Sequence, residues 1–114
     1  MIITSDKLFS AEEIKQLAEE FEVFVKIVID VEKKICSAGA NRHYENEKIL
    51  LERGSKQANL WGGGMDLETK DITIDSMINI RPSEGNRSNQ IQDPLTRQKF
   101  EELTKYFFPT IFND

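Results

Sequence analysis

The chain has 114 residues, of which 39% are hydrophobic and 31% are charged, and its formal net charge is −5 at pH 7. This composition is typical of one soluble globular domain with a single core, and it argues against intrinsic disorder and against an overall attraction to nucleic acid or anionic membranes. With one Cys and one His, the chain has no residues for an intrachain disulfide or for a classical zinc ligand set.

The first ten residues, MIITSDKLFS, lack the basic and apolar regions of a secretory signal. Residues 1–3 favour a short edge strand instead. No apolar run in the chain approaches the roughly 20 residues needed to cross a bilayer. We therefore expect residues 1–114 to form one cytoplasmic domain that makes no contact with a membrane.

A helix followed by a hairpin is predicted next. Ser10 and Glu13 have the spacing of a capping box, and the apolar residues that follow recur at helical spacing, which predicts a helix over residues 11–20. Residues 24–31 and 35–38 are rich in β-branched side chains and predict two strands. Their short polar connection favours an antiparallel hairpin.

The middle of the chain combines a charged helix with a glycine run. Residues 44–53 predict a helix that ends at Gly54, and residues 58–61 predict a third strand. The run Gly62–Gly64 is typical of a bulge, a bend or a flexible hairpin tip. It does not predict a phosphate-binding loop, because neither Gly-Lys-Ser/Thr nor a helix follows it.

The stretch from residue 72 to residue 94 organises the rest of the chain. Residues 72–81 alternate between apolar and polar side chains, which predicts a strand with an isoleucine face. The isoleucines of that face are Ile72, Ile74, Ile78 and Ile80. A polar loop follows over residues 82–92, and Asp93 and Pro94 then supply the N-cap and first position of a last helix.

The predicted elements follow the order helix, two strands, helix, two strands, helix. Each strand has one strongly apolar face and one mixed face. This pattern predicts an α+β fold, with a four-stranded antiparallel or mixed sheet and helices packed mainly on one face.

The polar loop and the strand before it carry the first candidate site. Arginine presents a planar fork of donors suited to carboxylate or phosphate, and the neighbouring amides and hydroxyl add neutral hydrogen-bonding groups. The predicted ligand-binding residues are Asn79, Arg81, Asn86, Arg87 and Ser88. The alternative is that the two arginines pair with Asp75, Glu84 or Asp93 and only hold the loop in place.

A second candidate site consists of Asp30, His43 and Glu47. The imidazole and a carboxylate one helical turn later can share a helix face, and Asp30 near a strand end adds a third possible metal ligand or orients the imidazole as a base. The spacing lacks a His-Glu-x-x-His signature. The alternative is that His43 is a capping or surface residue.

Three runs of sequence are similar to a known family. The segments IVIDVEKKICSAG, GSKQANLWG and SMINIRPSEGNRSNQIQDP resemble a family of small uncharacterised prokaryotic proteins, the domain of unknown function 5674. The resemblance covers residues 25–94. It implies a stand-alone fold in which Trp61, Arg81, Asn86 and Arg87 belong to the recurring pattern, and it brings no activity, cofactor or partner.

Three functions remain open on the sequence. The leading hypothesis is a non-enzymatic binding module without a cofactor, whose Arg/Asn-rich loop receives an acidic protein group or a phosphate. The second is a small metal-assisted hydrolase that uses Asp30, His43 and Glu47. The third is a homodimeric regulatory or assembly subunit, which associates through an exposed strand or through an aromatic carboxy-terminal end. That end contains Tyr106, Phe107, Phe108 and Phe112.

Overall fold

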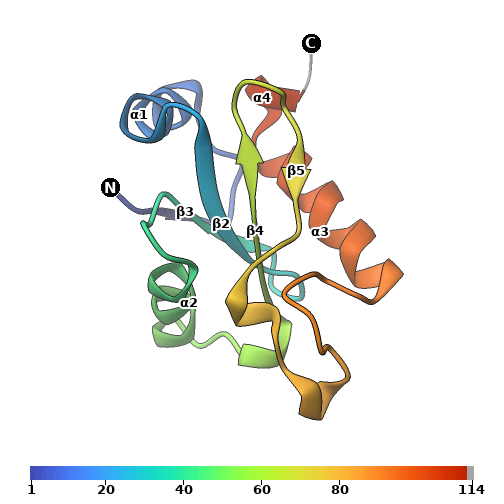
Figure 1. Ribbon diagram of the computed structural model, residues 1–114. Helices are drawn as coiled ribbons and strands as arrows, with labels where there is room; N and C mark the ends of the chain where they lie inside the picture. The colour runs from blue at the N-terminus through green and yellow to red at the C-terminus, as the bar shows by residue number, and fades with distance from the viewer. Residues whose placement is uncertain (113–114) are drawn as a thin grey trace.

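A single antiparallel sheet forms the centre of the molecule (Figure 1). The computed structural model describes residues 1–112. Over these residues the sheet has five strands in the order β1-β3-β2-β4-β5, and every neighbouring pair is antiparallel. The strands are β1 (Ile3–Ser5), β2 (Phe24–Asp30), β3 (Ile35–Ala38), β4 (Leu60–Asp66) and β5 (Ile72–Thr73).

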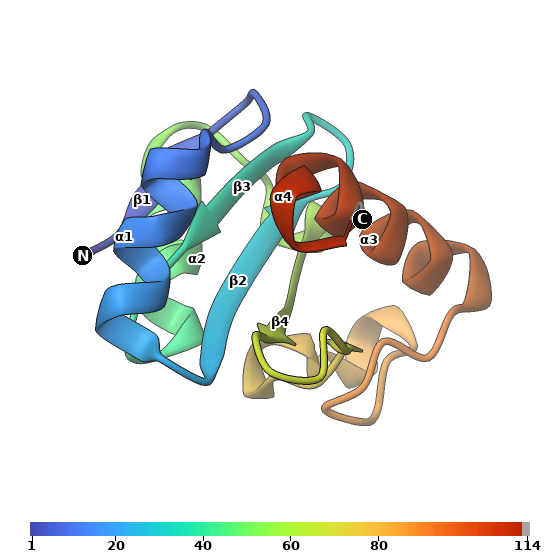
Figure 2. The same cartoon turned by 90° about the horizontal axis from the view of Figure 1, so that it is seen from above.

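Within residues 1–112, four helices cover the two faces of this sheet. They are α1 (Ala11–Phe21), α2 (His43–Glu52), α3 (Pro94–Phe107) and α4 (Pro109–Phe112). Side chains of α1, α3 and α4 belong to one large apolar cluster, whereas α2 contributes to a smaller cluster that includes Val28 and Leu60. Viewed from above, α1 lies at one end of the larger layer and α3 at the other, with α4 between them (Figure 2).

Strand β2 divides its side chains between these two clusters. Val25, Ile27 and Ile29 are almost completely buried in the large cluster. Val28 points to the opposite face, where it packs with Leu50 of α2, because successive side chains of a strand alternate. The alternation that predicts the strand therefore also assigns its two faces.

The helix starts and the hairpin are confirmed. Helix α1 begins with a capping box, in which the Glu13 amide donates to Ser10 Oγ and the Ser10 amide donates to Glu13 Oε1. Asp93 caps α3 by accepting from the Thr96 amide at 2.9 Å. Strands β2 and β3 form the expected antiparallel hairpin.

The glycine run does not form a hairpin tip. Gly62, Gly63 and Gly64 lie inside β4, where they pair with β2. A Cβ atom added to Gly63 would lie 2.8 Å from the Phe100 ring, and one added to Gly62 would lie 2.7 Å from Ser76 Cβ. The run is needed because elements approach β4 closely from both faces.

The prediction of a long fourth strand over residues 72–81 is wrong, and so is the predicted number of four strands. Strand β5 ends at Thr73, and the chain then enters a 3₁₀ turn at Met77–Asn79 (η2), which leaves Ile80 41% exposed. The sheet gains a fifth strand because Ile3–Ser5 pairs with β3. The short helix α4, which begins at Pro109, adds a fourth helix to the three predicted ones. No helix in the described chain has the length and apolar character required to span a membrane.

Candidate functional site

Asn86 holds the polar loop in a fixed shape. Its Nδ2 donates to the backbone oxygens of Asn79, Ser88 and Gln90, and its Oδ1 accepts from the amide of Gln92. The side chain is buried. The side-chain amide is therefore bonded to backbone groups of the loop and of Asn79 just before it, which makes Asn86 a structural residue of the loop.

Asn79 has a similar internal role beside β4. Its Oδ1 accepts from the Gly62 amide at 2.8 Å, and its Nδ2 donates to the Gly62 carbonyl at 3.0 Å. The same Nδ2 also donates to the carbonyls of Ile74 and Asn89. The side chain has no exposed surface. Asn79 thus joins the polar loop to the sheet and does not face solvent.

Arg81 is buried and bonds to backbone carbonyls. Its Nη1 donates to the Gln57 carbonyl at 2.8 Å, and its Nη2 donates to the carbonyls of Leu60 and Ile78. The guanidinium lies 4.0 Å from the centre of the Trp61 ring, which is a cation–π contact. The structure therefore gives Arg81 a loop-holding role, with carbonyls as its partners in place of the expected carboxylates.

Arg87 and Ser88 lie closer to solvent. The Arg87 side chain is exposed and has no hydrogen-bond or ion-pair partner within residues 1–112, while its backbone amide donates to Gln92 Oε1. Ser88 is half-buried, and its Oγ accepts from the Gln90 amide. Of the five residues expected to form one site, only Arg87 keeps a charged group available at the surface.

The hollow beside the polar loop is acidic. It has a volume of about 550 Å³ and contains two carboxylates but neither Lys nor Arg. Its lining residues are Trp61, Glu84, Gly85, Asn86, Gln92, Asp93 and Thr96. This charge does not suit an anion, and the expected anion-binding residues are not brought together around a common space.

The structure also does not bring Asp30, His43 and Glu47 together as ligands. Asp30 Oδ1 accepts from the amides of Glu32 and Lys33, and Asp30 Oδ2 accepts from Ser55 Oγ at 2.6 Å. One carboxylate oxygen therefore stabilises the β2–β3 turn, and the other binds the Ser55 hydroxyl. Within the described ranges, no three His, Cys, Asp or Glu side chains are placed to hold one metal ion.

The aromatic carboxy-terminal end belongs mostly to the core. Phe107 and Phe108 are completely buried, and both rings contact Phe9. Phe112 is half-buried against the large cluster, whereas Tyr106 is 51% exposed. Most of the aromatic surface considered for a dimer interface is thus already covered by this chain.

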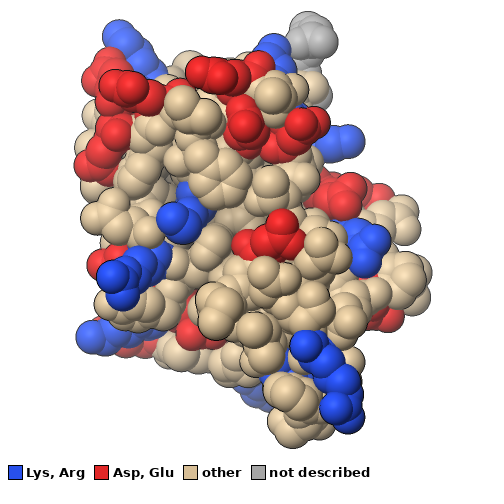
Figure 3. Space-filling view, in the orientation of Figure 1, with Lys and Arg blue, Asp and Glu red and all other residues tan. Residues whose placement is uncertain are grey.

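A cleft of different character opens where α2 begins. We call it the α2 cleft; its volume is about 480 Å³, and it contains two cationic side chains and an imidazole but no carboxylate. Its lining residues are Lys26, Asn41, Arg42, His43, Tyr44, Ser76, Met77 and Ile78. On the face shown in Figure 3, acidic side chains gather over α1 and the β4–β5 turn, while basic ones lie over the α2 side and the end of the polar loop.

His43, the first residue of α2, reaches across to β4. Its Nε2 lies 2.6 Å from the Gly63 carbonyl oxygen. Because a carbonyl can only accept, Nε2 carries the ring proton and Nδ1 keeps its lone pair. Burial lowers the pKa of His43; the hydrogen bond to Gly63 opposes this shift, and the charge of Lys26 adds to it. The imidazole is therefore neutral at pH 7.

Lys26 and Arg42 supply the positive charge of the α2 cleft. Lys26 is half-buried on β2 opposite Gly64, and no carboxylate within the described chain forms an ion pair with it. Arg42 is exposed immediately before α2, and its backbone amide donates to Glu45 Oε1 at 3.1 Å. The first amides of a helix lack acceptors within the helix and favour negative charge.

The wall of the α2 cleft is partly apolar. Met77 is 77% exposed and Tyr44 is 55% exposed, which is unusual for large side chains lining a concave surface. Ile78 is half-buried and packs against the smaller apolar cluster. Cationic groups and apolar groups therefore meet within one cleft.

Neither Lys26 nor Arg42 belongs to the sites predicted from sequence. Lys26 lies on the mixed face of a correctly predicted strand, so the face of the sheet on which it lies could be predicted from the sequence. The sequence does not contain the cross-strand register that places it opposite Gly64. The only sequence feature that could have pointed to Arg42 as a site residue is its position near the start of a helix.

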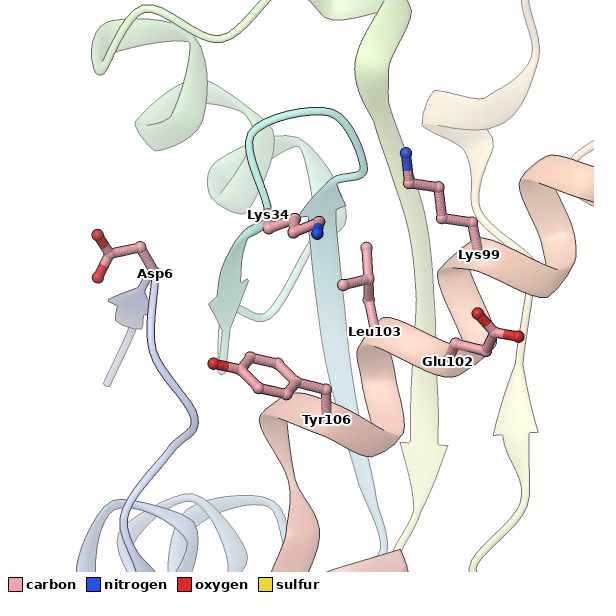
Figure 4. Close-up of a pocket in the computed structure, with 6 residues that line it drawn as sticks. All are labelled: Asp6, Lys34, Lys99, Glu102, Leu103 and Tyr106. Carbon is pink, nitrogen blue, oxygen red and sulfur yellow. The ribbon is translucent and has the colours of Figure 1, made fainter.

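A second hollow, between the β2–β3 turn and α3, has balanced charge (Figure 4). It is lined by Asp6, Lys34, Lys99, Glu102, Leu103 and Tyr106. Figure 4 shows the Tyr106 hydroxyl directed toward Asp6 and the Glu102 carboxylate directed away from Lys34. Two lysines and two carboxylates give this hollow no preference for one sign of ligand charge.

Comparison with known proteins shows which family the chain belongs to. Searches of the curated proteins and of the solved structures found no match to this chain. A family model described as "Protein of unknown function (DUF5674)" matches residues 1–107. This match covers nearly the whole chain, in agreement with the resemblance of its three sequence runs. The chain therefore belongs to the DUF5674 family of proteins of unknown function.

Proposed function

We propose that this protein binds a small anionic molecule that has an apolar part, and that the α2 cleft is the binding site. The observation that carries the proposal is the charge of the lining: Lys26 and Arg42 are present and carboxylates are absent, in a chain with a net charge of −5. The proposal keeps the anionic ligand expected from the sequence and moves its site from the polar loop to the α2 cleft.

The unpaired state of Lys26 supports an anionic ligand. A half-buried ammonium loses part of its hydration, and this cost is offset only when an opposite charge or hydrogen-bond acceptors approach it. The described part of the chain places no carboxylate within ion-pair distance of Lys26. A phosphate or carboxylate in the α2 cleft would supply the missing charge, and the reduced local dielectric would strengthen the contact relative to water.

The apolar wall supports a ligand with more than a charged group. Tyr44 and Met77 are strongly exposed although they line a concave surface. Covering such side chains is favourable by about 25 cal/mol for each Å² of apolar surface removed from water. An anionic head contacting Lys26 and a flat or aliphatic body contacting Met77 would use both properties of the cleft.

The direct test is a titration of the ¹⁵N-labelled protein with phenyl phosphate, followed by amide chemical shifts at low ionic strength. We expect shifts at the amides of residues 42–44 and 63–64. The Lys26→Ala variant should bind about tenfold more weakly, because a lost charge-assisted hydrogen bond is worth about 1.5 kcal/mol or more. Inorganic phosphate should bind in the same place but more weakly, because it leaves the apolar wall uncovered.

Lys99→Ala is the matched control. It removes the same charge from the hollow of mixed charge beside α3, so binding of phenyl phosphate should not change. If no amide around the α2 cleft shifts, or if Lys26→Ala and Lys99→Ala weaken binding equally, the α2 cleft is not an anion site.

A second candidate function rests on the fixed shape of the polar loop. Asn86 orders the loop through four hydrogen bonds, and Arg87 extends from it without a partner in the described residues. An exposed guanidinium on an ordered loop suits docking of a carboxylate from an acidic protein segment. A Glu-rich peptide should then bind Arg87→Ala more weakly than wild-type protein. Arg53, exposed at the end of α2, is the control, and Arg53→Ala should bind as wild type does. Equal binding by all three proteins contradicts this candidate.

A further inference from the structure

We propose that His43 accepts a phosphoryl group on Nδ1 from a small acyl phosphate bound in the α2 cleft. The inference rests on the proposed function, because the donor must first bind beside Lys26 and Arg42. It adds to that function a covalent step and names the class of ligand. Three features of the α2 cleft support it: the orientation of the imidazole, the charge around it and the absence of a competing carboxylate.

The first feature is a nucleophile with a defined tautomer. The Gly63 carbonyl fixes the proton on Nε2 through a contact of 2.6 Å. The lone pair is then on Nδ1, which has no hydrogen-bond partner in the part of the chain that the structure describes. A ring nitrogen oriented by a hydrogen bond through the other nitrogen is the usual arrangement of a reactive histidine.

The second feature is the positive charge around the imidazole. The transition state of phosphoryl transfer spreads negative charge over three equatorial oxygens, and proteins stabilise it mainly with positioned cations and amides. Lys26 and Arg42 line the same cleft as His43, and His43 and Tyr44 begin α2, where backbone amides lack acceptors within the helix. No carboxylate lines the cleft to repel the incoming group.

The step balances without any further reactant. The Nδ1 lone pair forms the N–P bond while the bond between phosphorus and the acyl oxygen breaks, and that electron pair leaves on the carboxylate product. No proton is transferred, because the ring keeps its proton on Nε2. The positive charge that develops on the ring is stabilised by the Gly63 carbonyl, which already accepts that proton.

The protonation state of His43 agrees with this role. A nucleophilic imidazole must be uncharged, and burial lowers the pKa of His43, so the neutral form dominates at pH 7. The chain has no second histidine that could accept the group.

Incubation with acetyl phosphate tests the step. We expect intact-mass spectrometry to detect one added phosphoryl group that is lost in mild acid, and ³¹P NMR to assign it to Nδ1. His43→Gln should abolish the modification, because a glutamine amide can still donate to Gly63 but has no nucleophilic ring nitrogen. Lys26→Ala should slow it by about tenfold, whereas Lys99→Ala should leave its rate unchanged.

Binding and phosphorylation are measured separately, so their failures are distinguishable. If phenyl phosphate shifts the cleft amides of wild type and of His43→Gln, but acetyl phosphate never modifies His43, the phosphoryl transfer is wrong and the binding function stands. If phenyl phosphate does not bind, both proposals are wrong. An acid-stable phosphate, or a phosphate that persists in His43→Gln, also contradicts the proposal, because it places the modification on another residue.

Discussion

Asn79 pairs with Gly62 as a neighbouring strand would. The Gly62 amide donates to Asn79 Oδ1 at 2.8 Å, and Asn79 Nδ2 donates back to the Gly62 carbonyl at 3.0 Å. Strand β5 has already ended at Thr73, so one side-chain amide satisfies the backbone of β4 beyond the point where the strand stops. Buried backbone groups require such partners, and this explains why Asn79 is completely buried.

Asn79→Ala should therefore destabilise the fold strongly. It leaves the Gly62 amide without its acceptor and takes the Asn79 donor away from the Gly62 carbonyl. The carbonyls of Ile74 and Asn89 each lose one donor but keep a backbone amide, from Ile91 and Ser76 respectively. Each buried unsatisfied group costs about 1–3 kcal/mol, so we expect the free energy of unfolding in urea to fall by about 3 kcal/mol or more. Asn89→Ala is the control, since its exposed side chain should change stability by less than about 0.5 kcal/mol. Equal effects of the two variants would disprove the structural role of Asn79.

The two arginines of the candidate loop should behave differently. Arg81→Lys replaces a fork that bonds to Gln57 and Leu60 with a single ammonium that cannot reach both carbonyls in the same geometry, and it weakens the stacking on Trp61. We expect the free energy of unfolding to fall by about 2 kcal/mol. Tryptophan fluorescence during urea unfolding would measure this change. Arg87→Lys should be neutral within about 0.5 kcal/mol. A neutral Arg81→Lys variant would contradict the buried role of Arg81.

Gly63 and Gly85 provide a matched pair of glycine substitutions. At Gly63, an added Cβ would lie 2.8 Å from the Phe100 ring and would also meet the backbone of Thr73. We expect Gly63→Ala to lower the unfolding free energy by about 3 kcal/mol, because overpacking of a tight core costs about 1–3 kcal/mol and the backbone contact cannot relax. Gly85 has a φ of +87° and no atom near its Cβ position, so Gly85→Ala should cost only about 1 kcal/mol. If Gly85→Ala has a lower melting temperature than Gly63→Ala, close packing against β4 is not the reason that glycine is required at position 63.

His43 should make the fold sensitive to mild acid. Its pKa is near 6.5 in the unfolded chain and lower in the folded protein, because burial disfavours the charged form. Below about pH 6.5 the unfolded chain takes up a proton that the folded chain does not, so the free energy of unfolding falls as the pH decreases. This loss continues until the pH passes the lowered pKa of the folded state.

His43→Gln should lack this contribution. Urea unfolding between about pH 7.5 and pH 5.5 should show a smaller loss of stability for His43→Gln than for wild type, while other groups titrate equally in both. A direct ¹H NMR titration of the single histidine should place its pKa below the unperturbed value. A pKa at or above that value would contradict the buried, neutral imidazole.

The local elements of this protein could be predicted from the sequence because their signals are local. The Ser10–Glu13 capping box and the Asp93 cap start the helices where expected, and the alternation in residues 24–31 identifies β2 together with its buried face. These features depend on neighbours within a few positions along the chain. The family resemblance was also contained in three contiguous runs, and the family match over residues 1–107 confirms it.

The candidate site could be predicted only in part. The sequence drew attention to His43, which lines the α2 cleft. It selected Asn79, Arg81, Asn86, Arg87 and Ser88 as ligand-binding residues, and the structure buries the first three of these. The sequence pattern of a polar residue on a strand face is the same in three cases. The side chain can bond to solvent, to a ligand, or to backbone groups of a strand whose neighbouring strand has ended. Asn79 and Arg81 are buried because β5 stops at Thr73 and leaves carbonyls that need donors.

Sequence by itself determined the α+β class, the positions of most helices and strands, the central hairpin and the family. Only the tertiary structure decided that Gly62–Gly64 lie inside β4, that Lys26 lines the α2 cleft, and that His43 reaches the Gly63 carbonyl. The physical reason is that caps and alternation are set by neighbours along the chain, whereas register, burial and hydrogen-bond partners are set by segments that meet only when the sheet forms.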